Sequence, residues 1–327
     1  MRRIYLLVYL VAALLLVACN TGEAGHVDEE EPAILMIPQL ETADLNDSKL
    51  RVVVTTSIIG DVVAHVGGEA IDLTVLIRAG QDSHSYEPGA QDLTAVADAH
   101  VIFINGWDLE EGLLDDLANI ADADILVPVS AGITPLPFAE EDEDEHQHHE
   151  DPHVWFDPQN VQQWVRNIEQ VLAALDPANE AVYHANAAAY SQDLDTLLEY
   201  MDEQVAQIPV DGRKLVTNHE ALGYLAARYD FTLIGTVLPG GSTLAEPSAN
   251  DLAQLAAAMQ EANTCTIFAE TTANTQLAQA AAAELDNCEQ VHVLSLYTEA
   301  ISPPGSEADS YIGMMRVNVD LLVTGSK

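Results

Sequence analysis

A long helical pattern divides this chain into two halves that repeat the same order of elements. Residues 177–208 are rich in alanine, and their apolar residues fall near helical spacing from Val182, through Ala185, to Met201. Pro177 fits the first turn of a helix, and the proline at 209 ends the pattern. At ~1.5 Å per residue this helix would be ~45 Å long, which is more than a small lobe needs. We therefore expect one long spine helix that joins two lobes.

Strand and helix signals alternate on both sides of this helix. Such alternation, with loops at the strand ends, favours a parallel sheet covered by helices. The sequence therefore predicts an α/β fold with two lobes, each built on a roughly four-stranded parallel sheet. The expected strands are 51–56, 71–77, 101–106 and 125–129 in the first lobe, and 214–217, 231–237, 266–270 and 291–294 in the second.

The N-terminal segment is typical of an exported protein. Arg2 and Arg3 precede an apolar run, residues 4–17, that is too short for a comfortable membrane span and reads as the core of a signal peptide. Small residues before Cys19 resemble a bacterial lipoprotein processing site, so we expect Cys19 to carry lipid. The alternative is an ordinary signal peptide that contains a cysteine.

The predicted organisation has five parts. A tether of some 30 residues, acidic overall and without sustained periodicity, would reach roughly 30 Å from the membrane. The boundaries are 1–18 for the signal peptide, 19–49 for the tether, 50–175 for the N-terminal lobe, 176–209 for the linking helix and 210–327 for the C-terminal lobe.

The chain is strongly acidic, with 53 Asp and Glu against 11 Lys and Arg and a formal net charge of −42. This charge argues against a nucleic-acid partner and favours the attraction of cations. Cys265 and Cys288 each precede an apolar run. In an exported protein such a pair favours a disulfide, and two buried thiols are the alternative.

Three histidines lie in three separate motifs, each at a predicted loop. They are His84 in Asp82-Ser83-His84, His153 in Asp151-Pro152-His153, and His219 in Asn218-His219-Glu220. Loops at the carboxyl ends of parallel strands are where α/β sheets bind ligands. A late acidic residue, Asp309, follows the last predicted strand. Three imidazoles and one carboxylate suit a tetrahedral divalent cation, zinc first, in a cleft between the lobes.

An acidic loop, residues 139–150, directly precedes the second motif. It carries three further histidines, which could bind zinc weakly, because His-rich tracts bind metals. The alternative is a solvated loop with no such role. These auxiliary candidates are His146, His148 and His149.

The motifs together resemble a known family, the cluster A-I (cluster 9) solute-binding lipoproteins of bacterial ABC importers for zinc and manganese. The resemblance covers about residues 51–322. Its carriers are Gly67-Gly68, His84-Ser85-Tyr86-Glu87-Pro88, Asn105-Gly106 with Glu110, Asp151-Pro152-His153-Val154-Trp155-Phe156-Asp157-Pro158, Asn218-His219-Glu220-Ala221-Leu222-Gly223-Tyr224, Glu246-Pro247-Ser248, Phe268-Ala269-Glu270, and Asp309-Ser310-Tyr311 with Met314-Met315.

The resemblance implies a function as well as a fold. It implies two α/β lobes joined by one long helix, with His84, His153, His219 and Asp309 as metal ligands. A histidine at position 219 implies zinc, whereas a glutamate there would imply manganese. The expected partners are an ABC permease and its ATPase, and the expected state is a monomer anchored by lipid on the extracytoplasmic side of the membrane.

Three alternatives stay open at this point. The first is uptake of manganese or iron(II) by the same class of importer. The second is a zinc hydrolase, although no His-Glu-x-x-His helix is present and four protein ligands leave no position for a reactive water. The third is an extracellular metal buffer or adhesin. In the main hypothesis, acidification below ~6 weakens metal binding, because protons compete for imidazole.

Overall fold

The computed structural model describes residues 34–138, 150–286 and 288–326, and these residues belong to one compact unit. The predicted signal peptide, Cys19 and the three auxiliary histidines lie outside the described residues. Within the described ranges, none of the helices combines the length and apolar character needed to cross a bilayer.

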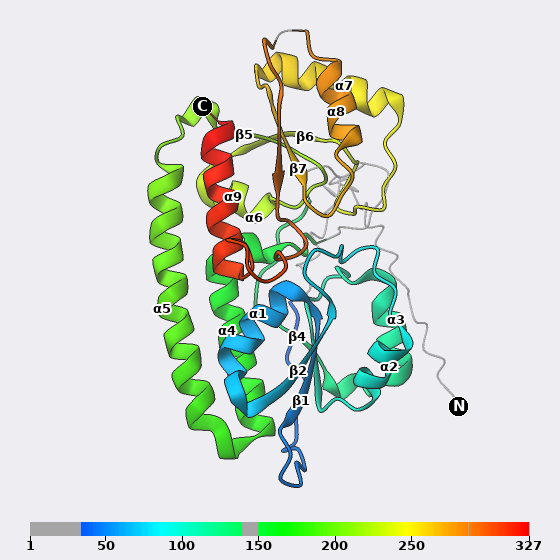
Figure 1. Ribbon diagram of the computed structural model, residues 1–327, viewed down its shortest axis with the longest axis vertical. Coiled ribbons are helices and arrows are strands. Elements are labelled where there is room, and N and C mark those ends of the chain that lie inside the picture. Colours follow the sequence, from blue (N-terminus) through cyan, green and yellow to red (C-terminus); the bar gives the residue numbers. More distant parts are fainter. Residues whose placement is uncertain (1–33, 139–149, 287, 327) are drawn as a thin grey trace, which may run out of the picture. The chain divides into compact units, whose positions relative to one another are not determined.

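The predicted fold class is confirmed, since the described residues form two sheets of four parallel strands each (Figure 1). The first sheet has the order β2-β1-β3-β4, and the second repeats it as β6-β5-β7-β8. The strands are β1 (Leu50–Thr56), β2 (Ile71–Ile77), β3 (Val101–Ile104), β4 (Leu126–Pro128), β5 (Lys214–Thr217), β6 (Thr232–Thr236), β7 (Thr266–Glu270) and β8 (His292–Leu296).

Helices cover both faces of each sheet. Alternate residues of a strand point to opposite faces, so the buried strands need apolar residues at consecutive positions. In β1, Val52 and Val54 join the core with the long helices, while Val53 joins a separate cluster with α2 and α3. The helices are α1 (Ser57–Gly67), α2 (Ala90–Ala97), α3 (Glu111–Ile120), α4 (Pro158–Leu175), α5 (Glu180–Val205), α6 (Gly223–Tyr229), α7 (Ala249–Ala262), α8 (Gln276–Ala283) and α9 (Tyr311–Gly325).

The long helix α5 contacts α1 and α4 of the first lobe and α9 of the second (Figure 1). A 3-10 turn, Pro177–Asn179, precedes it, because the carboxylate of Asp176 accepts hydrogen bonds from Asn179 Nδ2 and the Tyr183 hydroxyl. The main hydrophobic core includes Trp164 of α4, Leu194 of α5, Met315 of α9 and strand residues of both sheets. The two lobes therefore share one core along these helices.

Part of the segment assigned to the tether lies against the first lobe. The backbone N–H of Ala43 donates to the carbonyl of Leu175 over 2.9 Å, and Gly132 donates to the carbonyl of Leu35. Leu35 also packs so closely on Gly106 that a side chain there would collide with it. Residues 35–45 are thus a packed edge of the N-terminal lobe.

A disulfide joins Cys265 and Cys288, whose Cα atoms are 5.9 Å apart. Cys265 directly precedes β7, and Cys288 lies four residues before the paired strand β8. Because the two strands are parallel neighbours, their starts lie side by side at the end of the sheet opposite to Glu270.

Candidate metal centre

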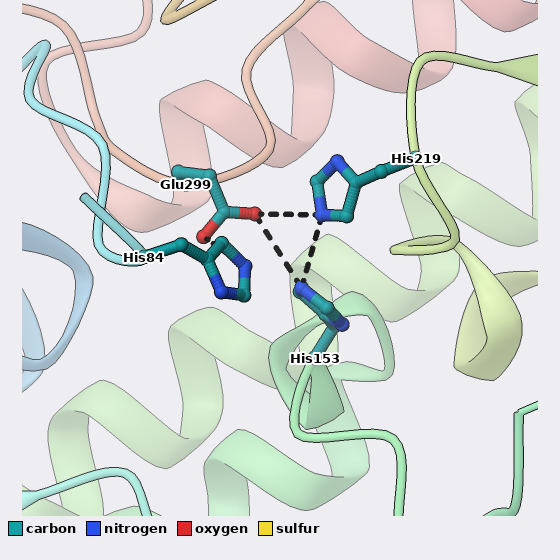
Figure 2. Close-up of side chains that lie close together, drawn as sticks. All are labelled: His84, His153, His219 and Glu299. Carbon is teal, nitrogen blue, oxygen red and sulfur yellow. Dashed lines mark hydrogen bonds and ion pairs between the residues drawn. The ribbon is translucent and has the colours of Figure 1, made fainter. Parts of the chain in front are cut away.

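Four buried side chains converge on one point between the two lobes (Figure 2). They are His84, His153, His219 and Glu299, and one ligand atom from each lies within 4.8 Å of those of the others. Nε2 of His153 and Nε2 of His219 are 3.2 Å apart. Oε1 of Glu299 lies 3.5 Å from each of these two nitrogens, and its Oε2 lies 3.7 Å from Nε2 of His84.

The four residues follow strand ends or precede helix starts. His84 lies in the loop after β2, and His219 comes two residues after the end of β5. Glu299 comes three residues after the end of β8, and His153 directly precedes a 3-10 turn, Val154–Phe156, that leads into α4. The carboxyl ends of parallel strands in both lobes thus face one site, as expected for ligand binding by α/β sheets.

The structure brings the three predicted histidines together but does not bring Asp309 to them. Asp309 is exposed, and its carboxylate accepts a hydrogen bond from the backbone of Gly305 over 2.8 Å. The expected carboxylate position is instead occupied by Glu299, which is 1 % exposed. Asp309 lies near the start of α9, thirteen residues after β8, whereas Glu299 remains beside the strand end. The sequence thus predicted a carboxylate beside the three histidines, and in the structure the carboxylate at that place belongs to Glu299 rather than to Asp309.

Two further carboxylates orient two of the imidazoles. Nδ1 of His153 donates to Oδ1 of Asp151 over 2.7 Å, and Nδ1 of His219 donates to Oε1 of Glu270. A proton held on Nδ1 leaves Nε2 of the neutral ring as the lone-pair donor. Both Nε2 atoms point to the common centre, so Asp151 and Glu270 fix the tautomer that a cation requires.

The motif around His153 consists of two turns that each begin with an aspartate. Oδ1 of Asp151 also accepts the backbone N–H of His153, and Oδ1 of Asp157 accepts the N–H of Gln159 at the start of α4. An aspartate that accepts an N–H two residues later stabilises such a turn. Pro158 then occupies the first turn of α4, where its missing N–H costs nothing.

Asn105 and Glu110 support the same loop from behind. Nδ2 of Asn105 donates to the carbonyl of Pro152 over 2.9 Å. Glu110, which is fully buried, accepts hydrogen bonds from the Asn105 backbone and from the hydroxyl of Thr55. Burial raises the pKa of Glu110, although these hydrogen bonds oppose the shift. Asn105 and Glu110 therefore position the loop that carries His153.

In the absence of metal, the negative carboxylates and the positively charged imidazoles of the site stabilise one another. Burial alone would raise the pKa of Glu299, but a hydrogen bond from His219 and the nearby charges of His84 and His153 hold that pKa well below its usual range. Burial also opposes a charge on His219, but the carboxylates of Glu270 and Glu299 raise the pKa of His219 well above its ordinary value.

The geometry fits a small divalent cation as cargo. In a tetrahedral site with metal–ligand distances of about 2.0–2.1 Å, neighbouring donors lie roughly 3.3 Å apart. The spacing of 3.2 Å between the His153 and His219 nitrogens, and of 3.5 Å from each to Glu299, matches that edge. A cation bound at this point would take the place of the protons that these imidazoles share with Glu299.

Comparisons with known proteins show which family the chain belongs to. A family model described as zinc-uptake complex component A, periplasmic, matches residues 52–325. The manganese-binding lipoprotein MntA of Halalkalibacterium halodurans is 32% identical over 319 residues, which cover 97% of this chain and 96% of that protein.

Solved structures of metal-binding proteins are also similar to this chain. The periplasmic zinc-binding protein TroA of Treponema pallidum is 29% identical with a TM-score of 0.77, over 85% of this chain and 99% of that chain. A manganese-bound periplasmic metal-binding protein of Candidatus Liberibacter asiaticus is 28% identical with a TM-score of 0.73, over 85% of this chain and 100% of that chain. This chain therefore belongs to the zinc-uptake complex component A family, as the metal-binding component of an ABC importer that works with a permease and an ATPase, and not as an enzyme.

Proposed function

We propose that the protein captures Zn²⁺ through His84, His153, His219 and Glu299 and delivers it to the permease. The observation that carries the proposal is the donor set, with three imidazole nitrogens and one carboxylate around a single buried point. Zinc favours imidazole nitrogen and four-coordinate geometry, whereas manganese prefers more oxygen ligands. Four protein donors also complete the shell and leave no position for a reactive water.

The surroundings of Glu299 support coordination through one oxygen. The hydroxyl of Ser83 donates to Oε2 of Glu299, while Oε1 faces the nitrogens of His153 and His219. A hydrogen bond to Oε2 reduces the tendency of that oxygen to bind a cation as well. One carboxylate oxygen and three nitrogens make the four-coordinate set that zinc prefers.

Manganese is the second candidate, and the relatives favour it. MntA of Halalkalibacterium halodurans is named as manganese-binding, and one of the similar structures contains manganese. A carboxylate that turns to offer both oxygens would give five donors, which suits manganese better. Iron(II) would be accepted by the same set.

Direct competition between metals tests this choice. The purified metal-free protein would be titrated with Zn²⁺ and Mn²⁺ separately and together, alongside His219→Ala and His219→Glu. We expect tighter zinc than manganese binding in the wild type, loss of zinc binding in His219→Ala, and a shift towards manganese in His219→Glu. Tight manganese binding with negligible zinc binding by the wild type would overturn the proposal.

We also propose that Cys19 carries the lipid that holds the protein on the extracytoplasmic face, where it acts as a monomer. Relatives are named lipoproteins, which supports this proposal. Cys19→Ser should move the protein from the membrane fraction to the soluble fraction, and light scattering should give a monomer mass. Retention of Cys19→Ser in the membrane fraction would refute lipidation at this residue.

The loop 139–150 carries an auxiliary proposal, that His146, His148 and His149 collect zinc for the main site. Deleting residues 140–150 and measuring zinc stoichiometry and the rate of transfer tests this role. A lower stoichiometry or slower loading is expected, and no change in either would reject it.

A further inference from the structure

A segment of the second lobe, residues 238–244, contacts the surroundings of all three histidines. It lies between β6 and α7 and is here called the bracket. Its backbone is held on both sides of His219: the N–H of Leu238 donates to the carbonyl of Asn218 over 2.7 Å, and the N–H of Glu220 donates to the carbonyl of Gly240 over 3.0 Å. A displacement of the bracket would therefore pull on the backbone that carries His219.

The bracket also reaches the loop that carries His84. The hydroxyl of Thr243 donates to Oδ2 of Asp82 over 2.6 Å, across the boundary between the lobes. The other oxygen of the same carboxylate, Oδ1, accepts the backbone N–H of His84 over 3.0 Å. Asp82 thus links Thr243 of one lobe to the backbone of His84 in the other.

A third contact lies beside His153. The ring of Phe138 packs on Gly241 of the bracket so closely that an added Cβ would lie 2.1 Å from its Cζ atom. The same ring is 6.4 Å from the imidazole of His153, centre to centre. Only glycine at position 241 allows the bracket to lie this close to Phe138.

The bracket ends at a cavity that borders the site at His84. This cavity has a volume of about 520 Å³, and its wall includes His84, Tyr86, Leu113 and Leu244, the last residue of the bracket. His84 is 6 % exposed, and the other three residues of the site are at most 1 % exposed. Of the four converging residues, His84 is the one that lines this cavity, and Leu244 lines it too.

We infer that the hydrogen bond between Thr243 and Asp82 is a latch that sets the rate of metal release. The inference rests on the proposed metal capture by the four converging residues. While the latch is closed, Asp82 holds the His84 backbone in its binding position and the bracket stays against the site. When it opens, the His84 loop loses one of its attachments to the second lobe, and the cation can leave past Leu244. Asp82 is a positioning residue, because it acts through His84.

The latch is not the sole attachment of the His84 loop, so its loss should change kinetics without destroying the site. The backbone of Gly80 donates to the carbonyl of Ile301 over 3.0 Å, and the Ser83 hydroxyl donates to Glu299. These two contacts also join the loop to the second lobe and remain in a Thr243 variant.

The experiment measures metal release from the full-length protein in a stopped-flow instrument with excess chelator, using Zn²⁺ as the probe. Thr243→Val removes the hydroxyl at nearly constant shape, and we expect release to be faster by about tenfold, as for the loss of one hydrogen bond to a charged acceptor. Thr243→Ser should restore a rate near that of the wild type. Asp82→Ala should release faster than Thr243→Val, and adding Thr243→Val to it should have little further effect.

Thr324→Val is the control substitution, because the hydroxyl of Thr324 donates to the backbone carbonyl of Asp320 within α9. This variant should release zinc at the wild-type rate. A Thr243→Val protein that releases zinc at the wild-type rate, or a Thr243→Ser protein that fails to restore it, overturns the latch. If the wild type itself binds no zinc or manganese, the proposed function fails instead. Equal circular dichroism spectra of the metal-free variants ensure that a fast release is not a folding defect.

Discussion

Nε2 of His153 and Nε2 of His219 face each other at 3.2 Å, although 66 residues separate them in the chain. Each ring donates through Nδ1 to its own carboxylate, Asp151 for one and Glu270 for the other. Two lone pairs cannot approach in this way unless a proton or a cation lies between them. The pair therefore forms a site where protons and metal compete for the same atoms.

The identity of the carboxylate ligand gives the first prediction. Glu299→Ala should weaken zinc binding by roughly 100-fold or more, beyond the range typical of residues that only orient a ligand. Asp309→Ala is the matched control and should keep the wild-type affinity, because Asp309 is exposed and bonds to the backbone of Gly305. Isothermal titration of both variants decides between the two acids. A large loss in Asp309→Ala with none in Glu299→Ala would contradict the assignment.

The orienting carboxylates give the second prediction. Glu270→Gln and Asp151→Asn keep an oxygen that can accept the Nδ1 proton but remove the negative charge. Each should weaken zinc binding by about 10–100-fold, the usual cost of losing such a partner. Competition with a chelator of known affinity measures the change. Affinity within twofold of the wild type in both variants would show that the charge behind the imidazole does not matter.

The third prediction concerns pH. The pKa of His219 in the metal-free protein is raised well above about 6.5, its ordinary value. The metal must displace that proton. Below the raised pKa of His219, the apparent affinity for the metal should therefore fall by about tenfold for each pH unit, and above that pKa it should level off. Competition by protons should therefore already be present at pH 7, above the window near 6 that the sequence predicts.

Calorimetry in two buffers of different ionisation enthalpy tests this prediction. At pH 7 the heat of zinc binding should differ between the two buffers. The size of the difference should correspond to the release of about one proton per cation bound. Glu270→Gln should move the onset of competition to lower pH, because it removes the carboxylate that favours the charged imidazole. Identical heats in both buffers for the wild type would rule out the proton on His219.

The disulfide gives the fourth prediction. Cys265 and Cys288 close a loop with a sequence separation of 23, so replacing both by serine should lower the free energy of unfolding by about 3 kcal/mol. Urea denaturation of the metal-free protein measures this change. The zinc affinity should stay unchanged, because the bridge lies at the start of β7 and Glu270 lies at its other end. A large loss of affinity would mean that the bridge shapes the site.

The sequence predicted both sheets and three of the four converging residues for identifiable reasons. Buried parallel strands need consecutive apolar residues, and each histidine lies in an ordered motif next to a strand end or a helix start. Glu299 has no such motif, since Thr298-Glu299-Ala300 resembles many loops. One feature of the sequence could have distinguished the two acids, namely their distance from the last strand. Glu299 follows the end of β8 by three residues, whereas Asp309 follows it by thirteen.

The apolar pattern also predicted the wrong buried residues at the start of the long helix. The expected pattern included Val182, yet Val182 is 44 % exposed while Tyr183 and Tyr190 are buried. Tyrosine carries a large apolar ring, but its hydroxyl needs a partner when buried. Asp176 and Asp61 accept those two hydroxyls, and these contacts between distant parts of the chain are not visible in the spacing of residues along one helix.

The core that runs through both lobes has a consequence for how the molecule melts. Trp164 of the first lobe, Leu194 of α5 and Met315 of the second belong to one continuous apolar cluster, so neither lobe can lose its packing alone without exposing the surface of the other. Thermal unfolding of the region from β1 to α9 should follow a single cooperative transition. A cation held by residues of both lobes would then raise the melting temperature of the whole body at once.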